Sequence, residues 1–314
     1  MSQTFATTGA ADHRRILACA AAWAGAPMAL ATVIETWRSS PCPLGTHMLV
    51  HADGRFTGSV SGGCVESDVL QTAADVIAGA PFAIRRYGLA DEAVWEAGLP
   101  CGGDIVVLVQ PVAPSAFAHG LFATIAAAHA QGSAQVIATD LASGLSTEGD
   151  AGDFVNIYQP PRRLIIVGAV EIAAALAAVS QAAGIAVTLV DPRARFLTAE
   201  RFPGVARDDR WPDDAIAALK PDARTAIVTL SHDPKIDDPA LIAALATPAA
   251  YVAALGSRAS HAARCARLRA FGIADADLAR IEGPAGIAIN AISAPEIALS
   301  IAGGMIRAFN AGLR

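Results

Sequence analysis

Two short motifs place a cysteine beside consecutive glycines. One is the Ser–Gly–Gly–Cys run that ends at Cys64, and the other is the Cys–Gly–Gly run that begins at Cys101. Because glycine lacks a Cβ, consecutive glycines let several backbone N–H groups turn toward one anion. A thiolate suits a soft metal–sulfur centre, and Cys64 precedes a predicted helix whose N-terminus favours negative charge. We therefore predict a cofactor site formed by Ser61, Gly62, Gly63, Gly102 and Gly103, with Cys64 and Cys101 as candidate metal ligands or sulfur carriers.

The alternative for Cys64 and Cys101 is the common role of a free cysteine, a small apolar side chain in the interior. This alternative stays open at both positions. The remaining cysteines, Cys19, Cys42 and Cys265, lie in no such motif, and we expect them to be structural. Because the five cysteines form no Cys-x-x-Cys pair, they predict neither a disulfide framework nor a zinc site and favour a reducing cytoplasm.

A second group of polar residues follows the ends of strands predicted in the second half of the chain. In a doubly wound parallel sheet, ligands bind beyond the carboxyl ends of the strands. Arginine suits two-point contacts with phosphate, and serine hydroxyls and backbone N–H groups can complete such a site. A single histidine or arginine in a loop is more often only solvated, but here several clusters share one predicted edge. The predicted cofactor-binding residues are Gly168, Asp191, Arg193, Ser231, His232, Asp233, Gly256, Ser257 and Arg258.

The turn that follows the first of these strands departs from the dinucleotide-binding pattern Gly-x-Gly-x-x-Gly/Ala. Gly168 and Ala173 fit its first and last positions, but Val170 replaces the glycine that admits the pyrophosphate. Glu171 adds a negative charge where a phosphate would sit. Asp191, by contrast, stands where an acidic residue binds a ribose. The turn argues against NAD(P) as the cofactor, and an NAD(P)-dependent oxidoreductase is kept as an alternative.

Strands and helices alternate through the second half and must position this edge. An apolar strand at 164–167, a helix at 170–183 and a strand at 186–190 make one βαβ unit, since a parallel pair needs such a crossover. Ser293 and Glu296 fit a capping box at the start of a final helix. The pattern predicts the α/β class, with a Rossmann-like doubly wound parallel sheet in residues 162–314. Further strands are expected at 225–230 and 251–255, with a helix at 239–246.

The first half is expected to form a mixed α/β domain over residues 1–150. Asp53–Gly54 between two short strands is a strong hairpin signal. A polar, glycine-rich stretch and Pro160–Pro161 follow, so we assign residues 151–161 to a linker. The predicted elements are strands at 29–37, 48–50, 56–60, 105–109 and 135–139, and helices at 14–24, 65–78 and 116–130.

Length, charge and absent motifs exclude several classes of protein. A chain of 314 residues suits two domains. Its net charge of −6, without a basic run, argues against nucleic acid as a partner. Residues 16–34 look like a membrane span, but the break at Gly25–Pro27 divides them into a helix and a strand, so we expect no span. The motifs of P-loop ATPases, zinc proteases and serine hydrolases are absent from the sequence.

These motifs together resemble the XdhC/CoxI family of xanthine dehydrogenase and carbon monoxide dehydrogenase accessory proteins. The similar runs are 58–66, 101–103, 191–193 with 200–203, 231–234 with 237–239, and 255–258. The resemblance implies a chaperone that binds molybdenum cofactor, as molybdopterin or its cytosine dinucleotide, rather than a turnover enzyme. It further implies sulfuration of the cofactor through a cysteine desulfurase, insertion into the large subunit of a molybdenum hydroxylase, and a homodimer. Molybdenum is then the metal for which Cys64 and Cys101 are candidates.

The chain departs from that family's usual pattern at three places. Val170 and Glu171 replace Gly and His in the glycine turn. The run 286–290 lacks the usual acid and a glycine, and Gly303–Gly304 stand where a small and an acidic residue are usual. These changes bear on which nucleotide form is bound. Besides the oxidoreductase, a non-catalytic docking partner of a dehydrogenase is kept as an alternative.

Overall fold

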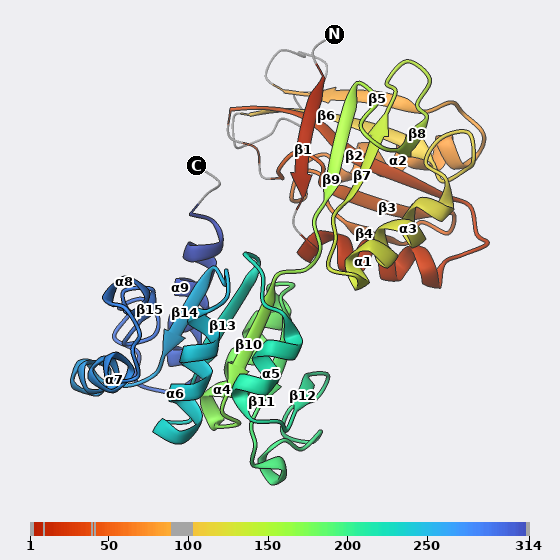
Figure 1. Cartoon of the computed structure of the whole chain (residues 1–314). Coiled ribbons are helices and arrows are strands. Elements are labelled where there is room, and N and C mark those ends of the chain that lie inside the picture. The colour runs from red at the N-terminus through yellow and green to blue at the C-terminus, as the bar shows by residue number, and fades with distance from the viewer. Residues whose placement is uncertain (1–2, 9, 39, 41, 89–102, 312–314) are drawn as a thin grey trace. The chain divides into compact units, whose positions relative to one another are not determined.

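The chain divides into two compact units, Met1–Pro161 and Arg162–Arg314 (Figure 1). The computed structural model describes residues 3–8, 10–38, 40, 42–88 and 103–311. Two of the predicted site residues, Cys101 and Gly102, lie outside these ranges. Each unit has hydrophobic clusters of its own, and the two are described separately.

The described part of the first unit is built on a five-stranded antiparallel sheet in the order β4-β3-β2-β6-β5. β3 and β4 pair on either side of Asp53–Gly54, which confirms the predicted hairpin. β5 is an edge strand that we did not predict, because Arg85 and Arg86 leave it almost without an apolar pattern. The strands are β2 (Met28–Trp37), β3 (His47–His51), β4 (Phe56–Gly58), β5 (Ala83–Tyr87) and β6 (Asp104–Pro111).

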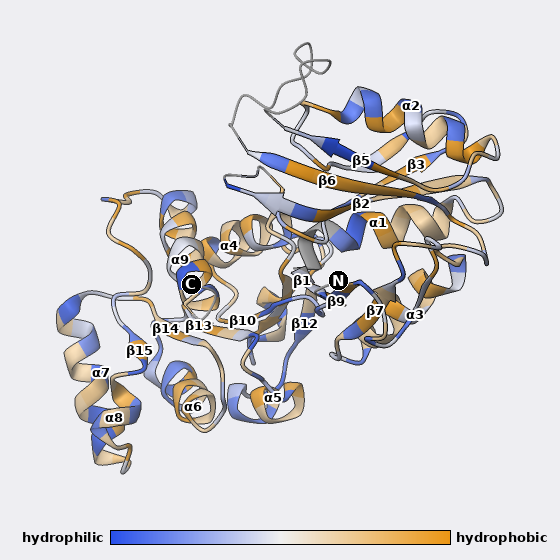
Figure 2. Cartoon of the chain, turned by 90° about the horizontal axis from the view of Figure 1, so that it is seen from above, coloured by the Kyte–Doolittle hydropathy of each residue, from blue (hydrophilic) through white to orange (hydrophobic). Residues whose placement is uncertain are grey.

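Helices cover both faces of this sheet. One face packs against α2 (Glu66–Ile77), and the other packs against α1 (Ala10–Ala22) and α3 (His119–Ala130). The first seven residues of β2 are buried and, apart from Thr32, apolar, and β6 is hydrophobic along most of its length (Figure 2). The membrane-like run at 16–34 is therefore the end of α1 followed by a core strand. In the part of the chain that is described, no helix is long and apolar enough to cross a membrane.

A second sheet, in the order β1-β9-β7-β8, completes the first unit. The predicted linker 151–161 contains β9, which pairs with β1 on one side and β7 on the other. We did not predict this strand, because its partner β1 lies at the opposite end of the unit's sequence and the glycine-rich turns around β8 look like a linker. The strands are β1 (Thr4–Thr8), β7 (Gln135–Thr139), β8 (Ser146–Glu148) and β9 (Phe154–Tyr158).

Over residues 162–311 the second unit has a six-stranded parallel sheet in the order β12-β11-β10-β13-β14-β15. Numbered within the unit this is 3-2-1-4-5-6, the strand order of dinucleotide-binding Rossmann folds. The predicted fold class is confirmed. The strands are β10 (Arg163–Val167), β11 (Ala186–Val190), β12 (Ala206–Asp208), β13 (Thr225–Thr229), β14 (Tyr251–Ala254) and β15 (Ile281–Glu282).

Helices also cover both faces of the parallel sheet. α4 (Glu171–Ala182) and α9 (Ala294–Phe309) pack on one face, with the predicted capping box at the start of α9. α5 (Pro212–Leu219) and α6 (Pro234–Leu245) pack on the other. The helix predicted at 239–246 begins earlier, because Asp233 caps it and Pro234 fits its first turn. The remaining helices are the 3₁₀ turn η2 (Ala194–Phe196), α7 (Arg258–Ala270) and α8 (Asp275–Leu278).

Candidate functional site

The turns after β10 and β13 touch at the carboxyl edge of the parallel sheet. Leu230 N–H donates to Val167 O over 2.8 Å. Gly168 has a φ of +107°, and a Cβ there would lie 2.7 Å from Ser231 N. Glycine is therefore required at this close approach. Two predicted site residues, Gly168 and Ser231, meet where the strand order reverses, which is the ligand position of such sheets.

Asp191 follows β11 and holds the glycine turn. Its carboxylate is completely buried and accepts a 2.8 Å hydrogen bond from Ala169 N–H. Arg193 binds both carboxylate oxygens, with Nε at 2.9 Å from Oδ1 and Nη2 at 2.7 Å from Oδ2. Burial alone would raise the pKa of Asp191, but the hydrogen bonds from Arg193 and Ala169 lower it below its ordinary value. Both oxygens are engaged, so this carboxylate does not present the free acceptor that ribose recognition needs.

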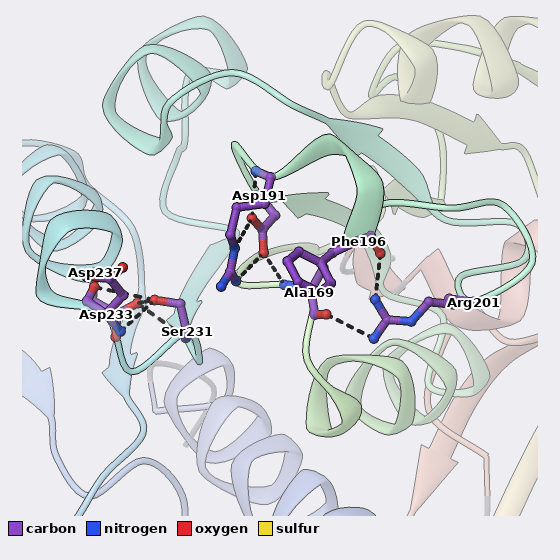
Figure 3. Close-up of polar contacts among 8 residues, drawn as sticks. Ala169, Asp191, Phe196, Arg201, Ser231, Asp233 and Asp237 are labelled. Carbon is purple, nitrogen blue, oxygen red and sulfur yellow. Dashed lines mark hydrogen bonds and ion pairs between the residues drawn. The ribbon is translucent and has the colours of Figure 1, made fainter.

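Three arginines surround the half-buried ring of Phe196 beside this turn. The guanidinium carbons of Arg193, Arg195 and Arg201 lie 4.8, 5.6 and 6.0 Å from the ring centroid. Arg201 donates to Phe196 O over 2.7 Å and to Ala169 O over 3.0 Å (Figure 3). Our sequence prediction omitted Arg201 from the site, although it lies within one of the family-like runs.

Ser231 and Asp237 form a buried polar contact on the other side of the glycine turn (Figure 3). Ser231 Oγ donates to Asp237 Oδ1 over 2.6 Å and accepts from Asp233 N–H over 3.1 Å. Asp237 is only 3% exposed, and burial raises its pKa. Asp233 itself caps α6 by accepting from Lys235 N–H, while His232 is exposed with a φ of +60°. The prediction included Ser231, His232 and Asp233 but omitted Asp237, one helical turn further on.

The loop after β14 reaches the same edge. Leu255 N–H donates to Thr229 O over 2.9 Å, and Ser257 caps α7 by accepting from Ser260 N–H. Gly256 has a φ of +140°, and the predicted residue Arg258 is exposed at the start of α7. Behind this loop lies Arg264, which belongs to no motif and was not among the predicted site residues. Arg264 is 5% exposed and donates to Leu255 O, but its Nε and Nη1 atoms are buried without a partner.

In the first unit, the carboxylate of Glu66 occupies the centre of the Ser–Gly–Gly–Cys loop. It accepts from Ser59 Oγ over 2.5 Å, from Ser61 N–H over 3.0 Å and from Gly63 N–H over 2.8 Å. Burial raises the pKa of Glu66, but the hydrogen bonds from Ser59 and Ser61 outweigh this effect and lower it to about 2. The loop therefore does form an anion-binding nest, but its anion in this structure is a side chain of the same loop.

The other N–H groups of this loop also have internal partners. Gly62 N–H donates to Ser59 Oγ, and Cys64 N–H donates to Ser61 Oγ over 2.9 Å. Cys64 is half-buried and packs partly against the core beneath α2, and the rest of its side chain is exposed to solvent. Gly103 is buried directly before β6. Among the described residues, no cluster of three or more His, Cys, Asp or Glu side chains could hold a metal ion.

The cysteines outside the motifs form no disulfides among the described residues and pack against the hydrophobic clusters. Cys42 is buried with the residues beneath α2, whereas Cys19 and Cys265 are half-buried. Their positions are those expected of structural side chains.

Two family models match the chain. The XdhC and CoxI family model matches residues 21–88, and the XdhC Rossmann domain model matches residues 164–305. The chain belongs to the XdhC and CoxI family. The first match contains the Glu66 loop, and the second contains the carboxyl edge described above. Both candidate sites therefore include residues that the family models match.

Similar proteins include a chaperone and a solved structure. The chain is 29% identical over 301 residues to the molybdenum cofactor insertion chaperone PaoD of Escherichia coli, covering 92% of this chain and 86% of PaoD. It is 24% identical over 280 residues to the uncharacterized protein YqeB of Escherichia coli, of which it spans only 42%. A crystal structure described as a xanthine dehydrogenase from Bacillus halodurans has a TM-score of 0.82 at 24% identity, with 96% of each chain covered. This last likeness establishes the fold.

Proposed function

We propose that this XdhC and CoxI family member is a maturation factor that binds molybdenum cofactor and delivers it to a molybdenum enzyme. The observation that carries the proposal is the similarity to PaoD over nearly the full length of both chains. A fold by itself does not assign a function. The proposal therefore also depends on the residues at the two candidate sites and on whether they suit such a cargo.

The carboxyl edge of the parallel sheet suits the phosphate of the cargo, molybdopterin or its cytosine dinucleotide. The edge combines glycine turns, the caps of α6 and α7 and several arginines, which are groups that bind phosphate. Arg264 adds buried guanidinium N–H groups that lack a protein partner. Such groups are costly to bury unless water or a ligand satisfies them. The residues we propose at this edge are Gly168, Arg193, Ser231, His232, Asp233, Gly256, Ser257 and Arg258, with Asp191 holding Arg193 and the glycine turn in place.

We assign the sulfur chemistry of the cargo to the first unit. Cys64 would contact the metal or carry sulfur, together with Cys101, and the loop 61–63 with Gly102 and Gly103 would position them. In this proposal a cysteine desulfurase supplies the sulfur, and the client is the large subunit of a molybdenum hydroxylase of the xanthine dehydrogenase or carbon monoxide dehydrogenase type. The protein acts as a cytoplasmic homodimer. The metal belongs to the cargo, so the protein's own part is binding and orientation.

Two features at the glycine turn weigh against the alternative of an NAD(P)-dependent oxidoreductase. Val170 places a half-buried side chain where pyrophosphate approaches the backbone in dinucleotide-binding folds. Asp191 is fully engaged by Arg193 and the turn. Titration with NADH, followed by cofactor fluorescence, separates the two functions. We expect no hydride transfer from NADH, whereas saturable binding with hydride transfer would favour the oxidoreductase.

Co-expression with the cofactor biosynthesis machinery tests the proposed function. We expect the purified protein to retain molybdenum and to activate a cofactor-free molybdenum hydroxylase. Cys64→Ser and Cys101→Ser should lower the retained molybdenum, whereas Cys265→Ser, a matched change in the second unit, should not. Full retention in both motif variants would remove the thiolate roles. A wild-type protein that captures the hydroxylase subunit but never carries molybdenum would instead be a docking partner.

A further inference from the structure

The cluster around Phe196 concentrates positive charge at one point of an acidic chain. Arg193 precedes η2, Arg195 lies within it and Arg201 follows it closely, so three guanidinium groups share one aromatic ring. The whole chain has a net charge of −6. A local excess of positive charge in such a protein attracts anions against the overall field.

The three arginines differ in how far their charge is already compensated. Arg193 has a bidentate ion pair with Asp191, and Asp233 and Asp237 attract it at longer range. Arg201 bonds to the carbonyl oxygens Phe196 O and Ala169 O, which leaves its charge without a carboxylate partner among the described residues. Arg195 is exposed and has no ion pair in the described part of the chain. Two cations are therefore available to a ligand.

The bonds of Arg201 fix its guanidinium group beside the turn that ordinarily binds pyrophosphate. Ala169 O, which accepts from Arg201, belongs to the turn between β10 and α4. Two of the five guanidinium N–H groups of Arg201 are used in this way, and the others stay available. α4 begins one residue after Val170 without a side-chain cap, so its first N–H groups add partial positive charge at the same edge.

We propose that Arg195 and Arg201 bind a diphosphate group at this edge, with Arg193 locked by Asp191 as their support. In dinucleotide-binding folds, glycine N–H groups bind the pyrophosphate and an acid binds the ribose. Here Val170 blocks the first contact and Arg193 occupies the acid, so guanidinium groups take over anion recognition. This inference rests on the proposed function only for the identity of the natural ligand, a phosphorylated cargo.

Calorimetric titration of the full chain with inorganic pyrophosphate at low salt tests the proposal, with inorganic phosphate in a parallel arm. We expect saturable binding of one pyrophosphate per chain, tighter than that of phosphate. Removing one charged contact should weaken the binding about tenfold or more. Arg195→Gln is the primary variant, because the Arg195 side chain has no hydrogen bond to any residue that the structure describes. Arg201→Lys, which keeps the charge but loses the planar fork, is the second.

Arg86→Gln is the matched control, since Arg86 is exposed on β5 of the first unit and has a long ion pair, 3.5 Å, with Glu35. It removes the same charge and should leave the affinity unchanged. Absent binding, binding that Arg195→Gln leaves intact, or equal weakening by Arg86→Gln would each overturn the diphosphate site. Molybdenum delivery that persists after such a result would leave the proposed function standing. If pyrophosphate binding depends on Arg195 but the protein never carries molybdenum, the diphosphate site stands and the proposed function fails.

Discussion

Glu66 accepts hydrogen bonds at the centre of the Ser–Gly–Gly–Cys loop. Its carboxylate collects donors from both sides of the loop, including Ser61 Oγ and Gly63 N–H. Since Ser61 Oγ in turn accepts from Cys64 N–H, the position of the cysteine backbone follows from that of the carboxylate. We interpret Glu66 as a positioning residue that fixes the loop before any ligand binds.

Glu66→Gln should loosen this loop. An amide can replace one carboxylate oxygen as acceptor, but its NH₂ group would face the donors Ser61 Oγ and Gly63 N–H. Leaving these donors unsatisfied should cost about 1–3 kcal/mol of unfolding free energy. Alkylation of Cys64, followed by mass spectrometry, should become faster than in wild type. Glu200→Gln, at an exposed position, serves as the control. Unchanged stability and labelling in Glu66→Gln would contradict the positioning role.

Residue types and spacing were enough to find both glycine–cysteine motifs and the polar turns. They could not predict which groups hydrogen-bond to one another, because this depends on how far each side chain reaches across a folded loop. Glu66 was visible within the motif, but its role as the internal anion was not. Likewise Asp191 was expected to bind a ligand, whereas in the structure its carboxylate pairs with Arg193. Arg264 has no sequence signal at all, because burial alone distinguishes it.

Among the elements at the carboxyl edge, the turn from β10 to α4 is constrained by both its backbone conformation and its packing. Gly168→Ala should strain it twice, through a φ of +107° and through the contact of the new Cβ with Ser231. We expect a loss of about 1–3 kcal/mol in chemical unfolding. Gly132→Ala isolates the backbone part, because Gly132 has a φ of +72° but open space around its Cβ position. Equal losses in the two variants would mean that the close approach to Ser231 contributes nothing.

The start of α4 also sets how strongly the edge attracts anions. Glu171 is exposed in the first turn, where its charge offsets the partial positive charge of the helix end. Glu171→Gln should therefore tighten pyrophosphate binding about two- to fivefold. Calorimetric titration at two salt concentrations measures this, and the gain should shrink as salt rises. Glu148→Gln, in the first unit, is the control, and weaker binding in Glu171→Gln would contradict the placement of the anion.

Regular elements of the second unit were predictable, because local hydrophobic runs and short βαβ connections define them. The elements we did not predict include several edge strands, the strand β9 and the helices α5, α7 and α8, of which α7 is rich in arginine and has little apolar pattern. β12 and β15 are short, and β5 is charged. β1 and β9 pair although they lie at opposite ends of the first unit's sequence. Local sequence patterns around either strand therefore do not reveal its partner.

At the scale of the whole molecule, a buried group of side chains in the first unit makes the stability of the protein sensitive to acid. His13, His47 and Tyr158 lie in mutual ring contact, and His47 Nε2 is 2.8 Å from Tyr158 OH. Burial lowers the pKa of His47 to about 4. Burial, followed by repulsion from His47 and His129, lowers the pKa of His13 to about 2. Both imidazoles are therefore neutral in the folded protein over the whole physiological range.

This cluster makes the stability of the protein depend on pH in a defined direction. In the unfolded chain both histidines protonate near pH 6.5, so above that value their contribution to stability is complete. It is lost as pH falls from 6.5 through about 4, the folded pKa of His47, by up to about 1.4 kcal/mol per pH unit for each histidine. His13→Phe should flatten this slope in chemical unfolding between pH 7 and 4.5, whereas the exposed His232→Gln should not. If the unfolding free energy of His13→Phe fell with pH as steeply as that of wild type, the acid sensitivity would come from other groups. Carboxylates cannot explain a difference between the two proteins, because they are the same in both.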